Sequence, residues 1–329
     1  MSTSPLTQFL LGKPTVLDTV LIFRGSICLI IVYFITLFRS VNCIVQVLLL
    51  TEVLDWTQLF PWVENECFPS FTFDYTDRNG PHMWKVLYPD STGFNQSPIN
   101  ITTRSVVVVQ PSEPLRWNGY NKAPLSISIM NNGNNVIVNT MWGSLTQPHV
   151  QGGSLTSIYD LCSMVFHWGR SDNEGSEHTL DYVRYPMELQ VWHIKRGFSS
   201  LMDAIDAKAS DALLIVSFLF QITNADNPYL DHLVTNLWQI VEPGSTLHIP
   251  PFPLTWICPF PENNYYTYNG SLTQPPCSEI VTWIVQPEPI AISSSQVAQF
   301  RKVCSANGPI LSNCRPVQLI NERDVYFHA

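Results

Sequence analysis

His167 is the residue whose type and surroundings raise the question of metal chemistry in this sequence. It lies in the apolar run "SMVFHW" (163–168), whose alternating pattern is typical of a β-strand. Side chains two positions apart on a strand share a face, so His167 shares its face with Val165. A metal site needs several donor atoms, and an isopropyl group supplies none. The pattern fits both the remnant of a metal site and an ordinary packed histidine.

Cysteine does not supply such a site. The eight cysteines form no CxxC pair, which argues against a thiolate zinc centre. Their irregular spacing in a chain of this length does not indicate a disulfide framework. Cys304 and Cys314 could bridge one loop, although the sequence does not establish such a bond. Pairing also stays open for Cys67, Cys162, Cys258 and Cys277.

The length and composition of the chain fit one large folded domain or two small ones. Hydrophobic residues make up 45% of the 329 residues and charged residues only 13%, which is enough for a sizeable core and argues against disorder. The formal net charge is −9, from 17 basic and 26 acidic side chains. Because no run of Lys and Arg occurs, we expect no nucleic-acid partner.

An apolar segment precedes this domain. Residues 25–38 carry no charge, and a second apolar run, 43–50, follows Arg39. The first run is shorter than the roughly 20 residues of a membrane span and fits the apolar core of a signal peptide. Residues 25–50 together could form one span, or the segment could be a gene-model artefact. We therefore treat residues 1–55 as a hydrophobic leader that is a signal peptide, a membrane anchor or an artefact, and 25–50 as its membrane-associating part.

The rest of the chain, residues 56–329, reads as a mainly β single domain. Turn residues separate short apolar or alternating runs, which predict strands. These runs are 105–109, 125–130, 135–142, 164–168, 187–194, 212–222 and 280–286. Short helices are expected at 199–208, 228–239 and 294–305. The pattern predicts a large sheet with peripheral helices.

Five strings, taken together and in order, resemble the α-carbonic anhydrase family over roughly residues 70–327. They are "NQSPINI" (95–101), "FHWGRSDNEGSEHTLD" (166–181), "YPMELQVWH" (185–193), "YNGSLTQPPCSEIVTWIV" (268–285) and "CRPVQLINERDVY" (314–326). The resemblance implies a central, largely antiparallel, ten-stranded twisted sheet with short peripheral helices and a conical cleft.

The resemblance also implies a zinc site, which this sequence has changed. In active members three histidines hold Zn²⁺, and its charge lowers the pKa of a bound water to about 7, so that hydroxide can attack CO₂. The matching positions here are Val165, His167 and Gln190. Only His167 is a histidine, and an amide oxygen is a weak zinc ligand. We therefore predict no metal and no cofactor; zinc would be the cofactor if enough affinity remained.

Other site positions match the family in part. Thr273 and Glu177 match the pair that orients the zinc-bound hydroxide, and Glu188 matches the carboxylate that steadies the third histidine. Ser163 replaces a glutamine that supports the first histidine. Asn134 stands at the proton-shuttle position and cannot carry a proton near neutral pH. We interpret these residues as vestiges of a catalytic site.

Four further residues match positions that support the fold in the family: His178, His193, Trp168 and Trp283. By the same resemblance, the two histidines lie beside the site rather than in it. Retained supporting residues beside altered ligands are what relaxed catalysis on a preserved scaffold would leave. His167 itself is then a packed or singly hydrogen-bonded histidine.

The local wording is most similar to the acatalytic carbonic anhydrase-related proteins, and to the type-eight kind among them. That resemblance predicts an inactive homologue of carbonate dehydratase that binds a protein partner, with the inositol trisphosphate receptor as a family precedent that transfers only weakly. It implies a cytoplasmic location, whereas a genuine leader implies a secreted or membrane-anchored one. Two alternatives are residual CO₂ hydration by a zinc enzyme, and a small-molecule or glycan receptor that uses the metal-free cleft.

Three Asn-x-Ser/Thr sequons occur, at Asn95, Asn100 and Asn269. Asn95 precedes Ser-Pro, which disfavours glycosylation, and Asn269 lies on a strand that leads to the expected cleft. Of the three, we expect Asn100 to be the one open to modification. Sequons alone do not establish secretion.

Overall fold

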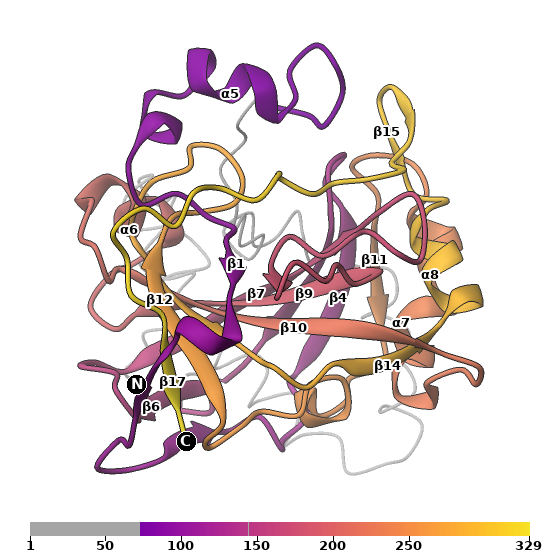
Figure 1. The fold of residues 1–329 in the computed structure, drawn as a ribbon. Helices are drawn as coiled ribbons and strands as arrows, with labels where there is room; N and C mark the ends of the chain where they lie inside the picture. The colour runs from indigo at the N-terminus through magenta and orange to yellow at the C-terminus, as the bar shows by residue number, and fades with distance from the viewer. Residues whose placement is uncertain (1–72, 144) are drawn as a thin grey trace, which may run out of the picture. The chain divides into compact units, whose positions relative to one another are not determined.

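A large twisted sheet dominates the computed structural model, which describes residues 73–143 and 145–329 (Figure 1). These residues belong to one compact unit, Glu66–Ala329. The expected leader and its boundary at residue 55 lie outside the described residues. Within them, no helix is long and apolar enough to cross a membrane.

The main path of the sheet has ten strands among the described residues, as the resemblance implies. In spatial order they are β11 (Thr246–Ile249), β4 (Ser126–Asn131), β5 (Val136–Met141), β7 (Tyr159–Trp168), β9 (Met187–Lys195), β10 (Leu213–Thr223), β13 (Val281–Val285), β12 (Tyr265–Gly270), β17 (Tyr326–His328) and β2 (Val107–Val109). Most neighbours are antiparallel, but β10–β13 and β17–β2 are parallel. The predicted largely antiparallel sheet is thereby confirmed, and the conical cleft stays a prediction.

Shorter strands extend this sheet or stand apart from it. β14 (Ile290–Ser293) pairs with β10, while β3 (Leu115–Asn118) and β6 (His149–Gly152) form an arm that joins β7. Two separate pairs are β1 (Asn100–Ile101) with β8 (Thr179–Leu180), and β15 (Cys304–Ser305) with β16 (Gly308–Pro309). Each of the seven predicted strand segments overlaps an observed strand.

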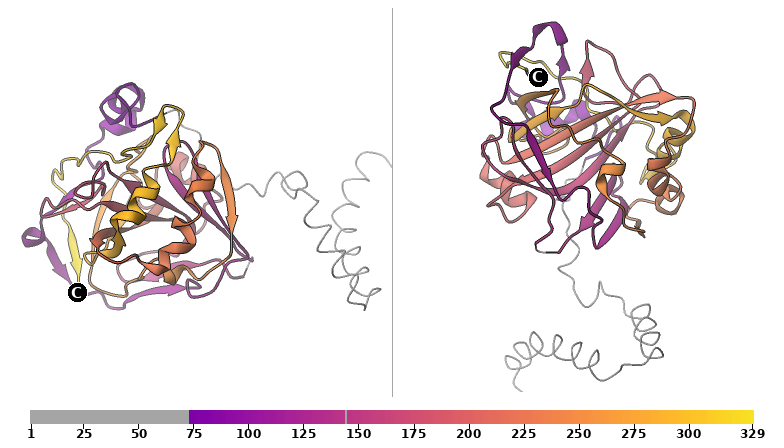
Figure 2. Two further views of the ribbon diagram at one scale, coloured as in Figure 1. Left: turned by 90° about the vertical axis from the view of Figure 1, so that its right-hand side faces the viewer. Right: turned by 90° about the horizontal axis from the view of Figure 1, so that it is seen from below.

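The helices are short and peripheral. They are α5 (Pro81–Leu87), α6 (Leu201–Ala207), α7 (Asp231–Val234) and α8 (Ser294–Phe300), with 3₁₀ turns η1 (Pro89–Thr92), η2 (Thr103–Ser105), η3 (Pro228–Leu230), η4 (Leu237–Ile240) and η5 (Leu254–Trp256). Figure 2 shows α7 and α8 side by side. The helix expected at 228–239 is broken into three pieces. The one expected at 294–305 ends at Phe300, and α5 was not anticipated.

Local signals explain where α8 begins. The Ser293 hydroxyl accepts a hydrogen bond from the backbone nitrogen of Gln296 at 3.1 Å, and Gln296 Oε1 accepts one from the backbone nitrogen of Ser293 at 3.2 Å. This reciprocal capping box satisfies donors that the first helical turn leaves unpaired.

The two faces of the sheet bury different sets of side chains. Along β9, Leu189 and Val191 enter the larger hydrophobic core, while Trp192 enters a second core that also contains Val165 and Trp283. Strands β7, β9 and β10 are buried over most of their length. Buried strands in the middle of a sheet hold their side chains rigidly, so polar residues on them have fixed directions.

The cysteines are settled in part by the structure. Cys258, Cys277, Cys304 and Cys314 are free thiols, so the loop bridge considered for Cys304 and Cys314 does not form. Cys162 is disulfide-bonded. Disulfides are typical of oxidising compartments.

Candidate functional site

The candidate site is built on two neighbouring antiparallel strands, β7 and β9. Their register places Val165 opposite Gln190, and His167 opposite Glu188. Since alternate residues of a strand share a face, these four side chains and Ser163 point to the same side of the sheet. All five are buried, with at most 1% of each residue exposed. The structure therefore brings together the positions that the sequence singled out.

Glu188 is held by a dense set of hydrogen bonds. Its Oε2 accepts from the backbone nitrogens of Glu177 and His178 at 2.9 and 2.8 Å, and its Oε1 lies 2.8 Å from His178 Nδ1. Burial alone would raise the pKa of this carboxyl, but the charge and hydrogen bonds of His178 outweigh it and lower the pKa to about 2. Glu188 is therefore a fixed carboxylate at neutral pH.

Glu177 occupies a different electrostatic environment. Its Oε1 accepts from the backbone nitrogen of Arg315 at 2.8 Å. Burial raises its pKa, and the Glu188 carboxylate raises it further, while His167 and a hydrogen bond with Thr273 act in the opposite direction. Two buried carboxyl groups close together cannot both ionise easily, so the pKa values of this pair move apart.

The Gln190 amide lies between the two carboxyl groups. Its Nε2 donates to Glu177 Oε2 at 2.7 Å and to Glu188 Oε1 at 3.2 Å, and Thr273 Oγ1 lies 3.4 Å away. Donation to a carboxylate is a charge-assisted hydrogen bond, stronger than one between neutral groups. Gln190 is thus held through its nitrogen, and its oxygen has no hydrogen-bond partner among the described residues.

His167 is anchored at one ring nitrogen. Its Nδ1 lies 2.8 Å from the backbone carbonyl of Asn313, which can only accept, so Nδ1 carries a proton. In the neutral ring Nε2 is then an acceptor, and within the described part of the chain this buried atom has no partner. The interpretation of His167 as singly hydrogen-bonded agrees with this geometry. The Oε1 atom of the Glu177 carboxyl group lies 3.6 Å from His167 Nδ1.

Asn313 is the site residue that sequence reasoning missed. It is fully buried, and its Oδ1 accepts from the backbone nitrogen of Trp168 at 2.7 Å. Its Nδ2 donates to the backbone carbonyls of Asn134 and Phe166 at 3.0 and 3.1 Å. With its own carbonyl on His167, it ties three segments together. Its position just before the string "CRPV" was the available signal.

The remaining predicted residues lie around this group. Asn134, in the turn between β4 and β5, donates through Nδ2 to the carbonyl of Phe73 at 2.9 Å. His178 Nε2 lies 2.7 Å from Tyr268 Oη, and its ring packs edge-on against Trp283 at 4.6 Å. His178 is therefore hydrogen-bonded to Glu188 of the site.

His193 and Trp168 are fixed elsewhere. His193 Nε2 is 2.7 Å from Tyr120 Oη. The His193 ring lies on the opposite face of the sheet from Gln190 because the two residues are three positions apart on β9. Burial lowers its pKa to about 4. Trp168 Nε1 donates to the carbonyl of Ile310 at 2.7 Å.

Comparison with known proteins assigns this architecture. A family model described as eukaryotic-type carbonic anhydrase matches residues 79–329. The chain belongs to this family. It is 36% identical over 262 residues to carbonic anhydrase 1 of Monodelphis domestica, which covers 78% of this chain and 97% of that protein. It is 32% identical to carbonic anhydrase 3 of Homo sapiens and 34% identical to that of Sus scrofa, each over 257 residues, 76% of this chain and 96% of the relative.

The donor atoms of this carbonic anhydrase homologue can be compared with what zinc requires. Catalytic zinc is held by three strong protein donors and keeps a fourth position for water. The three matching positions supply one imidazole, one amide oxygen and the hydrocarbon side chain of Val165. Across residues 73–143 and 145–329, no three His, Cys, Asp or Glu side chains are grouped so as to hold a metal ion. The donor set does not fit a catalytic zinc.

Proposed function

We propose that this carbonic anhydrase homologue lacks carbonate dehydratase activity and acts by binding another protein. The observation that carries the proposal is the Gln190 amide. Its nitrogen donates to both Glu177 and Glu188, which fills the space between the carboxyl groups with a neutral donor. Converting water to hydroxide at neutral pH needs a Lewis acid of high charge, which this arrangement holds poorly.

Two further residues support the loss of turnover. Val165 is buried in an apolar core and offers no donor atom. Asn134 donates its side-chain amide to the Phe73 carbonyl, and an amide does not exchange protons near neutral pH, so it cannot shuttle them. The carbonate dehydratase lineage is thus retained in the fold, while the groups that would perform the chemistry have changed.

The proposal is tested by metal content and CO₂ hydration of the full chain, purified without chelators. We expect less than stoichiometric zinc and no hydration above the uncatalysed rate. The matched variant is Val165→His with Gln190→His, which restores two imidazoles beside His167 while Thr273, Glu177 and Glu188 stay in place. This variant should bind zinc and gain hydration. Stoichiometric zinc with hydration in the unmodified chain would contradict the proposal.

One observation favours a second candidate, a residual zinc enzyme. His167 Nε2 and Gln190 Oε1 are both buried acceptors without a partner in the described residues. Buried acceptors are normally satisfied, and two on one side of the sheet fit a weakly held cation or an ordered water. Titration with Zn²⁺, with His167→Leu as control, separates the two: a cation site loses affinity in the variant, and a water site shows none in either protein.

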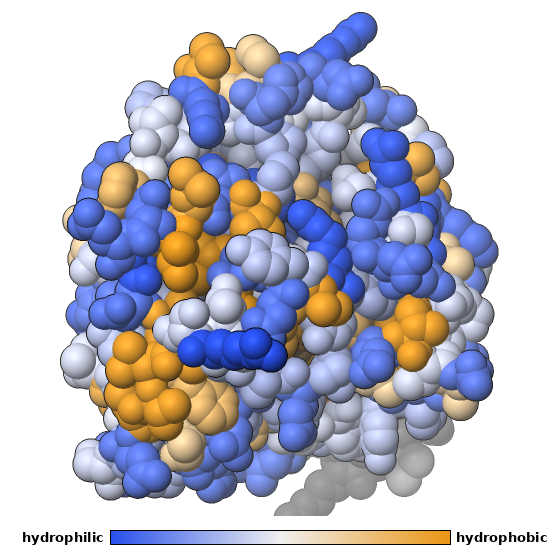
Figure 3. Space-filling view, in the orientation of Figure 1, coloured by the Kyte–Doolittle hydropathy of each residue, from blue (hydrophilic) through white to orange (hydrophobic). Residues whose placement is uncertain are grey.

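The binding role rests on the surface as well as on the site. Figure 3 shows apolar residues exposed in several patches among hydrophilic ones. Exposed large apolar side chains include Val86, Phe94 and Leu319, at 75%, 58% and 78%. Patches of this kind are typical of protein-interaction sites. We propose that the partner is another protein. The inositol trisphosphate receptor, suggested by the type-eight resemblance, is the first to test by co-precipitation with the purified chain.

A further inference from the structure

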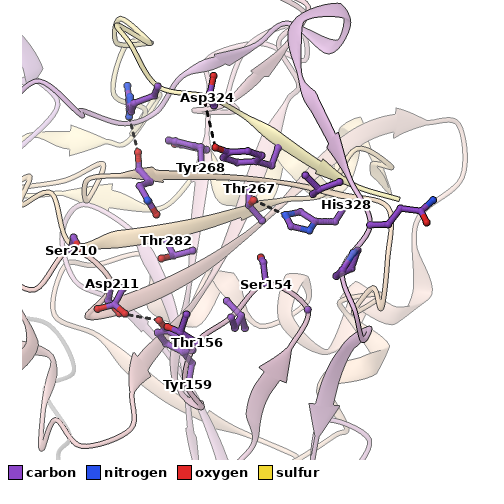
Figure 4. A pocket seen from close by; sticks show the side chains of 18 residues that line it. Ser154, Thr156, Tyr159, Ser210, Asp211, Thr267, Tyr268, Thr282, Asp324 and His328 are labelled. Carbon is purple, nitrogen blue, oxygen red and sulfur yellow. Dashed lines mark hydrogen bonds between the residues drawn. The ribbon is translucent and has the colours of Figure 1, made fainter.

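A pocket opens beside strands β12 and β13 (Figure 4). It has a volume of about 680 Å³ and is lined in part by Thr267 and Asn269 of β12 and Thr282 of β13. Tyr268, which contacts His178, lies between the first two on β12, so these two residues point away from the site. The volume is within the roughly 300–1,000 Å³ of small-molecule sites.

Asn269 is the sequon asparagine that lies on this pocket. It is exposed, and Gly270 and Ser271 complete the Asn-x-Ser pattern. Its backbone carbonyl accepts from Arg323 Nη1 at 3.2 Å. Its side-chain amide has no hydrogen-bond partner among residues 73–143 and 145–329. The amide nitrogen that would carry a sugar is therefore uncommitted, on an exposed residue.

Asn100 differs in each of these respects. Its Oδ1 accepts from Thr179 Oγ1 at 2.8 Å and from the backbone nitrogen of Tyr182 at 2.7 Å, and its Nδ2 donates to Thr102 Oγ1 at 3.1 Å. It is only partly exposed and joins β1 to the turn after β8. A bulky substituent on Nδ2 would have to displace these contacts. The expectation that Asn100 is the open sequon thus has less support than one for Asn269.

We propose that Asn269 is an N-glycosylation site and that its glycan begins over this pocket. In the reaction, Asn269 Nδ2 forms a bond to the anomeric carbon of an oligosaccharide carried on a lipid diphosphate. The bond from that carbon to the diphosphate oxygen breaks, and the lipid diphosphate leaves with the electron pair. The amide proton passes to a base of the transferring enzyme. Thr282 and Ser210 also line the pocket and carry hydroxyl groups that are available to hydrogen-bond the first sugar.

The structure also dictates when this modification occurs. The Ser271 hydroxyl is fully buried; it donates to the carbonyl of Leu272 at 2.8 Å and accepts from the backbone nitrogen of Ser97 at 2.9 Å. A transferase that reads this hydroxyl cannot reach it in the folded chain, so transfer precedes folding. Entry into the secretory pathway agrees with the apolar residues 25–50 and with the disulfide at Cys162.

The test is expression of the full chain in eukaryotic cells, followed by intact mass with and without peptide N-glycosidase. We expect one glycan on the unmodified chain and on Asn100→Gln, and none on Asn269→Gln. No glycan on the unmodified chain would overturn the proposal, as would a glycan that is lost with Asn100→Gln and kept with Asn269→Gln.

Two measurements keep the result independent of folding in the variants. Enzymatic deglycosylation of the unmodified chain in heavy-oxygen water converts a glycosylated asparagine to a labelled aspartate, and the label is expected in the peptide that contains Asn269. In a second measurement, the bacterially produced chain is offered to oligosaccharyltransferase folded and denatured. Only the denatured chain should be modified, and modification of the folded chain alone would contradict the proposed order of events.

Discussion

The candidate site has two halves that differ in how completely their polar atoms are hydrogen-bonded. The Glu188 half consists of Glu188 and His178, and the His167 half consists of His167 and Gln190. Both oxygens of Glu188 accept hydrogen bonds, from the backbone of Glu177 and from the backbone and ring of His178. In contrast, His167 Nε2 and Gln190 Oε1 have no partner within the described residues. The two halves are a few residues apart on the same pair of strands.

The difference follows from what each group bonds to. Glu188 and His178 use protein atoms that the fold itself supplies, so their hydrogen bonds need no metal. In the family pattern, the positions of Val165, His167 and Gln190 face the metal, and their outward atoms depend on it. The proposed loss of the zinc ligands accounts for one half that is fully hydrogen-bonded and another that contains unsatisfied acceptors.

Removal of the Glu188 carboxylate should have the largest effect. The Glu188→Ala variant leaves two backbone N–H groups and the His178 ring without an acceptor, and breaking such a buried charged network costs about 3–5 kcal/mol. Chemical denaturation measures the free energy of unfolding. The control is Glu113→Ala, which removes an exposed ion pair with Arg116 worth about 0–1 kcal/mol. Equal losses in both variants would contradict the structural importance of the Glu188 half.

Acid should lower the free energy of unfolding in two steps, one from each face of the sheet. Burial lowers the pKa of His193 from 6.5 to about 4. As the pH falls, His193 binds a proton at a higher pH in the unfolded chain than in the folded one. The stabilisation by neutral His193 is therefore complete above about pH 6.5 and is lost as the pH falls through 4. At about 1.4 kcal/mol per unit, the loss is about 3 kcal/mol.

The Glu188 contribution lies in a lower pH window. Its pKa is lowered from 4.5 to about 2, so its stabilisation is present above about pH 4.5 and disappears as the pH falls through 2. The free energy of unfolding should therefore fall in two stages as the pH is lowered. The His193→Gln variant should flatten the upper stage and leave the lower one. An unchanged upper stage would show that another group titrates there.

The Asn313→Ala variant tests how strongly the segment just before Cys314 is held to strand β7 beside His167. It removes the acceptor of the Trp168 backbone nitrogen and the donor to the Asn134 carbonyl, while the Phe166 carbonyl keeps a hydrogen bond from Asn135. The loss should cost about 2 kcal/mol. Thermal and chemical unfolding measure the loss, and the exposed Asn307→Ala serves as control. A change no larger than that of the control would remove Asn313 from the site.

The smallest effect is expected at His167. Because only Nδ1 is hydrogen-bonded, the His167→Leu variant loses one bond and also removes an unsatisfied buried acceptor, so the net cost should be about 1 kcal/mol. His178→Leu breaks bonds at both ring nitrogens and should cost about twice as much. The comparison fails if the two variants are equally stable in denaturant.

Much of the fold could be predicted from local patterns. Alternating runs predicted strands such as β5 and β9 because a strand repeats its facing every two residues. The prediction of one helix over 228–239 was wrong, since only Asp231–Val234 is α-helical and 3₁₀ turns lie before and after it. Helix α5 was missed because its seven residues carry a weak periodic signal.

The sequence by itself determined the sheet and the family, and it placed Val165, His167 and Gln190 at the positions that match the family's zinc ligands. Only the tertiary structure decided that the Gln190 nitrogen donates to Glu177 and that Asn313, 146 positions from His167, holds its ring. It also decided that Asn269 is exposed while Asn100 is tied to Thr179 and Tyr182. The reason is physical: facing on a strand is set by neighbours in the chain, whereas a hydrogen-bond partner is set by which distant segments the folded core brings within about 3 Å.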